Sequence, residues 1–134
     1  MATRPLSLIS FRPHKNQRAH FSIFVPSAGD PSKGTLIHVV GAPMVGFSLE
    51  FKRNYSPADT VQPHTIIPIG DVYENNILDS TTTERSIDTA PRGNIEIAAS
   101  QVPPPRISQN FLAPVDGVSW KCTRKVIETV THKY

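Results

Sequence analysis

The fold is decided by three short runs: Ala19-His-Phe-Ser-Ile-Phe-Val-Pro26, Gly34-Thr-Leu-Ile-His-Val-Val-Gly41 and Gly46-Phe-Ser-Leu-Glu-Phe-Lys-Arg53. Each run is rich in β-branched and aromatic residues and is bounded by turn-forming residues, which is typical of β-strands. In the third run apolar residues alternate with polar ones such as Glu50. This pattern predicts a strand with one buried face and one solvent-exposed face. Because the connections are short, the three strands should pair as an antiparallel meander.

The rest of the chain adds one strand and two helices to this expectation. Residues Thr65–Ile69 are a plausible fourth strand. A helix should begin at Thr89 or Pro91 and end before Pro103, because proline breaks helices. A second helix is predicted over residues 118–132, where valines recur every fourth residue. The predicted fold class is therefore α+β, a small antiparallel sheet followed by C-terminal helices.

The chain of 134 residues is expected to form one domain. We expect residues 1–18 to be a polar N-terminal lead-in, with a short edge strand near residues 6–11, and residues 19–134 to form the single α+β domain.

Composition excludes several function classes. The net charge of +3 is mild and the Lys and Arg residues are scattered, so we expect no nucleic-acid binding. A single cysteine excludes an internal disulfide framework. No apolar run is long enough to span a membrane, and the N-terminus lacks the pattern of a signal peptide. The expected location is the cytosol, and the oligomeric state stays open.

Three residues are candidates for chemistry: Cys122, His20 and His38. Cys122 near a helix start can be a nucleophile, because the helix field favours a thiolate. Its valine-rich stripe is equally typical of a buried core cysteine. His20 can be the general base that activates the thiol, or a structural histidine. His38, inside an aliphatic run, can orient His20 from a paired strand or face solvent.

A metal site is a weaker alternative. His20, His38 and His64 are the available imidazoles, but they lack the spacing of a zinc motif. We therefore expect neither a metal nor another cofactor.

The strand block, together with Val102-Pro-Pro-Pro105, resembles a family of small fungal proteins of undefined function. These proteins look like circularly permuted papain-like thiol hydrolases, related to the lecithin–retinol acyltransferase type and to permuted deubiquitinating peptidases. The resemblance implies a permuted papain-like fold, with the base on the first strand, a polar orienting residue on a following strand and a cysteine opening a late helix. His20, His38 and Cys122 occur in that order.

The chain departs from this pattern at the nucleophile. The family pattern is Asn-Cys-Gln-x-Trp, whereas the corresponding segment of this sequence is Pro114-Val-Asp-Gly-Val-Ser-Trp-Lys-Cys122. If Trp120 is the family tryptophan, Gly117 occupies the nucleophile position. Cys122 would then lie about 7 Å further along the helix.

Three functions follow from these residues. The first is a thiol hydrolase or acyl-transfer enzyme that cleaves an amide or ester of a small molecule or peptide through a Cys–His pair. The second is a degenerate member that uses the same cleft to bind or transform a metabolite without the thiol, as in fungal secondary metabolism. The third is a protein-interaction module that uses a sheet edge.

Overall fold

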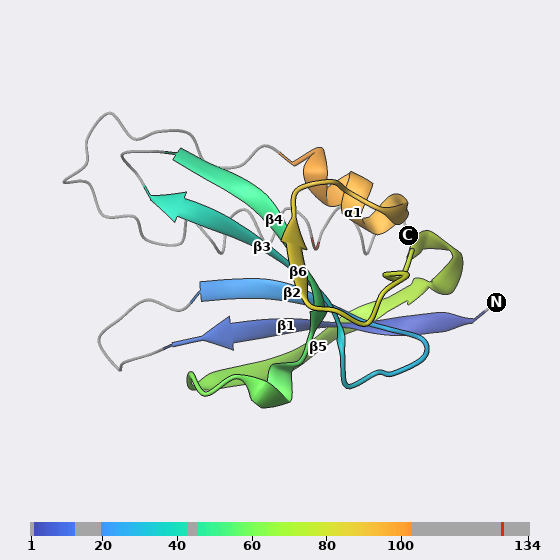
Figure 1. Ribbon diagram of the computed structural model, residues 1–134, viewed down its shortest axis with the longest axis horizontal. Coiled ribbons are helices and arrows are strands. Elements are labelled where there is room, and N and C mark those ends of the chain that lie inside the picture. The colour runs from blue at the N-terminus through green and yellow to red at the C-terminus, as the bar shows by residue number, and fades with distance from the viewer. Residues whose placement is uncertain (1, 13–19, 43–45, 103–126, 128–134) are drawn as a thin grey trace.

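The computed structural model describes residues 2–12, 20–42, 46–102 and 127. They form mostly one six-stranded antiparallel sheet with the spatial order β5-β1-β2-β3-β4-β6 (Figure 1). The strands are β1 (Thr3–Phe11), β2 (His20–Pro26), β3 (Gly34–Ala42), β4 (Gly46–Tyr55), β5 (His64–Tyr73) and β6 (Ser86–Asp88). The helices of the described part are α1 (Gly93–Ser100) and two single 3-10 turns, η1 (Pro57–Asp59) and η2 (Glu74–Asn76).

The meander predicted from the three decisive runs is confirmed. β2 pairs with β3 and β3 pairs with β4, both antiparallel. Gly41 lies near the end of β3 with a φ of 140°, and a Cβ at this position would lie only 2.1 Å from the carbonyl oxygen of Gly46 on β4. Glycine is the residue that tolerates both conditions, so it allows the close approach of β3 and β4 at this end of the hairpin.

Each face of the sheet carries its own apolar cluster, because successive strand residues point to opposite sides. Ile37 and Ile23 belong to the larger cluster, which includes residues of α1. Leu36 and Phe24, their neighbours in sequence, belong to a smaller cluster on the other face. The larger cluster consists of Leu6, Ile23, Val25, Ile37, Phe51, Val72, Ile95, Ala98 and Ala99. The smaller one consists of Ile9, Phe11, Phe24 and Leu36.

The helix expected after Pro91 is present as α1, and a buried arginine ties it to the sheet. Arg53 on β4 is 2% exposed. Its guanidinium donates to Glu96 of α1 at 2.6 Å and to Asp88 of β6 at 2.9 Å. These two partners offset the cost of burying the charge. The network explains why α1, drawn in orange in Figure 1, lies close to β4 and β6.

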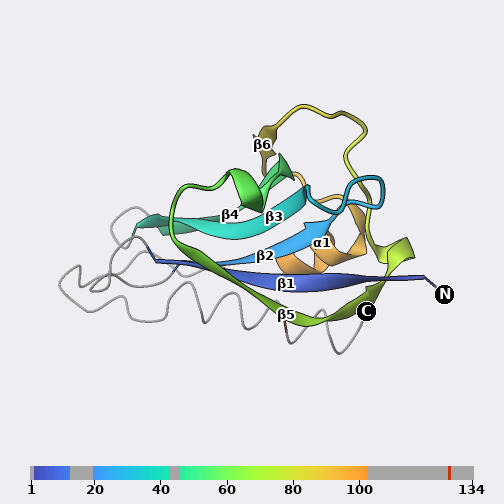
Figure 2. The same ribbon diagram turned by 90° about the horizontal axis from the view of Figure 1, so that it is seen from below.

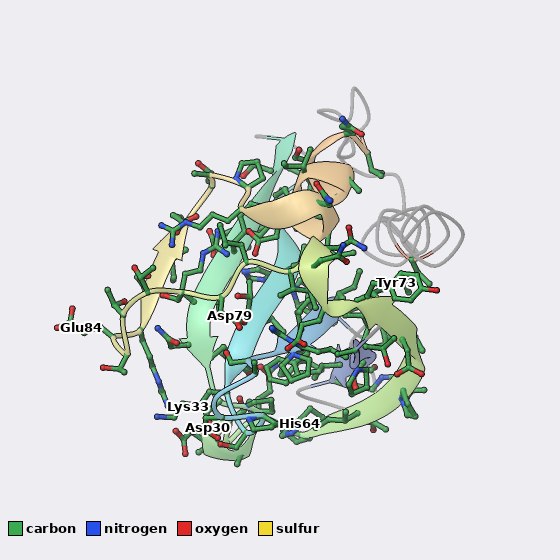
Figure 3. The ribbon with its side chains drawn as sticks, turned by 90° about the vertical axis from the view of Figure 1, so that its right-hand side faces the viewer. Asp30, Lys33, His64, Tyr73, Asp79 and Glu84 are labelled. Atoms are coloured by element: carbon green, nitrogen blue, oxygen red, sulfur yellow. The ribbon has the colours of Figure 1, made fainter. Side chains whose placement is uncertain are left out.

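Residues 3–11, which the sequence analysis places in the lead-in, form β1 between β5 and β2. Figure 2 shows β1 and β5 side by side along the sheet. Arg4 is buried at the start of β1 and donates to Asp79 (labelled in Figure 3) at 2.7 Å and to Glu74 at 3.1 Å. A basic residue in this strand is therefore a core residue with paired charge.

The predicted fold class is wrong. The described residues are not an α+β domain with C-terminal helices, but mostly one antiparallel sheet with a single short α-helix. The physical reason is that residues 3–11 and 64–73 pair with each other over their whole length, which enlarges the sheet from the three-strand meander. The helix predicted over residues 118–132 lies outside the described residues, apart from Ile127, which packs against the larger cluster. No helix in the described part is long and apolar enough to cross a membrane.

Candidate functional site

The structure brings His20 and His38 together on the face that carries the smaller cluster. His20 begins β2 beside Phe11 of β1, and His38 lies within β3 between Leu36 and Val40. The His20 Nε2 and His38 Nδ1 atoms are 3.2 Å apart, which is hydrogen-bond distance. The two rings meet edge to face, with 5.5 Å between their centroids.

The two histidines are not directly opposite each other. The paired part of β2 and β3 begins at Ile23 and Ile37, so His20 lies beyond it. Since neighbouring strands keep diagonal positions within reach of long side chains, the two rings can still form a hydrogen bond. The expected orientation of His20 by His38 thus uses a diagonal contact.

Glu50 is a third member of the site, and the sequence analysis did not select it. His38 and Glu50 are directly paired across β3 and β4. The His38 Nε2 and Glu50 Oε1 atoms are 3.0 Å apart. The alternation of apolar and polar residues in β4 predicts that Glu50 lies on the solvent-exposed face. The signal that identifies it is the register of the glycine-bounded hairpin, which places residue 50 opposite residue 38.

The carboxylate of Glu50 fixes the proton positions along the chain of three side chains. A carboxylate only accepts hydrogen bonds, so His38 must donate to it from Nε2. The Nδ1 of neutral His38 is then an acceptor and receives the Nε2–H of His20. In this arrangement the Nδ1 of His20 keeps its lone pair, and no other described residue bonds to it. His20 is therefore set up to accept a proton at Nδ1.

Burial keeps both imidazoles neutral at neutral pH. Loss of hydration lowers the pKa of His20 to about 4, with smaller contributions from the charges of His38 and Lys52. Burial also lowers the pKa of His38, although the hydrogen bond to Glu50 opposes this change. A neutral His20 has the lone pair that a general base requires.

A cavity of about 500 Å³ opens beside the two histidines. Strands β1, β2, β3 and β4 supply one part of its lining, and residues 59–62, from the end of η1 onward, supply the rest. The Tyr55 hydroxyl and the Thr60 hydroxyl are hydrogen-bonded, which holds this segment against β4. The lining residues are Phe11, His20, Leu36, His38, Val40, Lys52, Tyr55, Asp59, Thr60, Val61 and Gln62. This size and mixture of apolar and polar groups are typical of small-molecule sites.

The third sequence candidate, Cys122, lies outside the described residues, as do Gly117 and Trp120. The structure therefore places two of the three predicted residues. His64 lies at the start of β5, where Figure 3 labels it, and its ring Nδ1 is 2.9 Å from the carbonyl oxygen of Gln62. Within the described ranges, no cluster of three or more His, Cys, Asp or Glu residues is arranged to hold a metal ion.

These observations define a class of protein: an antiparallel sheet with hydrogen-bonded Glu50, His38 and His20 side chains beside a cavity. Residues 6–132 match the model of a family of unknown function, DUF6540. The match covers nearly the whole sequence, so the chain belongs to this family. No curated protein and no solved structure matched the chain.

Proposed function

We propose that the chain is a thiol hydrolase or acyl-transfer enzyme that acts on an amide or ester, with His20 as its general base. The observation that carries this proposal is the chain of contacts Glu50–His38–His20, at 3.0 Å and 3.2 Å. It orients one imidazole, fixes its tautomer, and leaves one ring nitrogen beside a cavity without a partner among the described residues. Nucleophilic catalysis uses a base that a further group orients, and here His38, held by the Glu50 carboxylate, would be that group.

In the proposed reaction Cys122 supplies the nucleophile. Its thiol proton passes to His20 Nδ1, and the thiolate attacks the carbonyl carbon of the substrate. His20 then returns the proton to the leaving amine or alcohol, and a thioester remains on Cys122. In the second half, His20 takes a proton from water or from an alcohol or amine acceptor, whose oxygen or nitrogen attacks the thioester carbonyl. The bond to the Cys122 sulfur breaks, the acyl group leaves on the acceptor, and His20 returns the proton to the Cys122 thiolate. The negative charge of Glu50 stabilises the imidazolium through His38.

Support for Cys122 comes from the sequence alone. The order His20, His38, Cys122 resembles the order in papain-like thiol hydrolases. A free thiol also fits the cytosolic location that we propose, because thiols stay reduced there. The position of Gly117 argues against Cys122.

The second candidate function is acid–base chemistry on a bound metabolite without the thiol. One observation supports it: within the described part of the chain, residues 11–62 supply both the Glu50–His38–His20 contacts and the cavity lining, so a proton-accepting imidazole lies beside a cavity. His20 would then activate a water molecule or a group of the metabolite itself.

Alkylation of the single cysteine separates the two functions. The rate of iodoacetamide modification is measured across pH in the native wild-type protein and in His20→Gln. A thiol enzyme predicts fast modification with a midpoint well below the free-thiol pKa of about 8.5, and loss of that low midpoint in His20→Gln. His64→Gln is the matched control, because His64 takes no part in the histidine chain.

Hydrolysis of p-nitrophenyl esters gives the second measurement. The thiol mechanism predicts that Cys122→Ala and His20→Gln both lose the activity, whereas His64→Gln keeps it. Loss in His20→Gln with full activity in Cys122→Ala would instead support the non-thiol candidate. Unchanged ester hydrolysis in His20→Gln would contradict both.

A further inference from the structure

We propose that the cavity beside His20 and His38 takes an anionic ligand with a short apolar tail, a monocarboxylate, and that Lys52 binds its carboxylate. The inference names the substrate or product class of the site, and in that respect it rests on the proposed function. It follows from the charges and the apolar walls of the cavity.

Lys52 is the cation among the described lining residues of the cavity, and none of the described carboxylates forms an ion pair with its Nζ. The nearby acidic groups have other partners: Asp59 pairs with Arg85, and Glu50 bonds to His38. Glu50 keeps its negative charge because His38 is neutral, so Lys52 is a local cationic group and not the source of a net positive charge. The Lys52 ammonium is therefore the group of this lining that can pair with the carboxylate of a ligand.

The position of Lys52 brings an anion next to the histidine chain. Lys52 follows Glu50 by two residues on β4, so both side chains leave the same face of the sheet as His38. Its Nζ lies 5.9 Å from the centre of the Tyr55 ring, which also lines the cavity. Its charge is felt at both His20 and His38, where it lowers the pKa. A carboxylate bound at Lys52 would therefore lie close to the proposed base.

The remaining walls fit an apolar tail. Phe11 and Leu36 are buried residues of the smaller cluster and form part of the lining. Val61, on the segment after η1, is fully exposed on the other side of the cavity and has apolar surface free for a ligand. Covering such surface with an alkyl chain contributes about 0.8 kcal/mol per methylene group. The cavity thus combines one cationic point with an apolar lining.

The test uses the full chain and three probes of equal length: hexanoate, hexan-1-ol and hexylamine. The ring resonances of the histidines report binding in NMR titrations, and His20→Gln and His38→Gln assign the signals. We expect saturable shifts of both rings with hexanoate, at an affinity roughly fivefold or more above that of hexan-1-ol, the size of one partly exposed ion pair. Hexylamine should bind most weakly. Bound hexanoate should also raise the pKa of His20.

Variants of Lys52 decide whether this residue causes the preference for hexanoate over hexan-1-ol. Lys52→Met keeps the apolar stem and should bind hexanoate and hexan-1-ol equally, whereas Lys52→Arg should keep the preference for the acid. The inference is overturned if hexanoate gives no saturable shift, if the wild type binds both probes equally, or if Lys52→Met keeps the preference. None of the probes has a bond to hydrolyse. A failure of the proposed enzyme function would therefore appear in the ester assay and leave this result unchanged.

Discussion

Acid should destabilise this protein through His20. In the folded chain the pKa of His20 is about 4, mainly because burial removes water from the ring, whereas its ordinary value is 6.5. Between these two values the unfolded chain binds a proton that the folded chain does not bind. The free energy of unfolding should therefore fall as the pH drops from about 6.5 to about 4, and this contribution should level off below that.

The size of the effect follows from the two pKa values. Each pKa unit corresponds to about 1.4 kcal/mol, so a difference of about 2.5 units gives a limit of about 3.4 kcal/mol at low pH. At pH 5 the same relation gives a loss of about 2 kcal/mol relative to pH 7. The His20 ring is only partly buried, and solvent screening reduces the expected loss to about 1 kcal/mol.

Urea unfolding followed by circular dichroism at pH 7 and pH 5 measures this loss. The wild type and His64→Gln should lose about 1 kcal/mol more than His20→Gln between the two pH values. The contribution of the carboxylates is shared by all three proteins and cancels in the comparison, whereas His38 contacts His20 and its changed contribution is part of the measured difference. An equal loss in His20→Gln and in the wild type would refute the argument that burial keeps His20 neutral.

Three further substitutions test the remaining contacts. Glu50→Gln should lower the pKa of His38 further, because the carboxylate raises it; an NMR titration that finds no decrease would contradict the pairing. Ser22→Ala should raise the free energy of unfolding in urea by up to about 1 kcal/mol, because the buried Ser22 hydroxyl has no hydrogen-bond partner among the described residues; a loss of stability would contradict this. Arg53→Met should cost about 3–5 kcal/mol, because Glu96 would remain buried without its partner. The double variant with Glu96→Gln should recover part of that loss in thermal unfolding, and no recovery would refute the pairing.

The central strands could be predicted because they are rich in β-branched and aromatic residues and because turn-forming residues bound each of them. β1 could be predicted only in part, as a short edge strand near residues 6–11. Leu6 and Leu8 lie on one face of β1 and Ile9 and Phe11 on the other, and all four side chains are buried. A strand that is buried on both faces shows no alternation of apolar and polar residues, so its length and its place inside the sheet could not be recognised from the sequence. Arg4 added to the difficulty, because its burial depends on Glu74 and Asp79, which lie far away in the sequence.

Two of the site residues could be predicted for a different reason. A histidine within an aliphatic strand is unusual by itself, so His20 and His38 stand out without any tertiary information. Glu50 does not stand out, because a glutamate at a polar position of an alternating strand is typical of a solvent-facing side. Its role depends on the residue opposite it, and that is decided by the register of the hairpin.

The alternation of apolar and polar residues along β4 predicts a solvent-exposed face, and this is the face that holds the candidate site. Along β3 it presents Leu36, His38 and Val40, and along β4 it presents Glu50 and Lys52. A solvent-facing side would be polar on both strands, and a core would be apolar on both. Here an apolar strand lies beside a charged one, and the segment after β4 shelters both from water. This pairing of an apolar strand with a charged one accompanies the cavity for which we propose an amphipathic ligand, and it becomes visible only once the hairpin register is known.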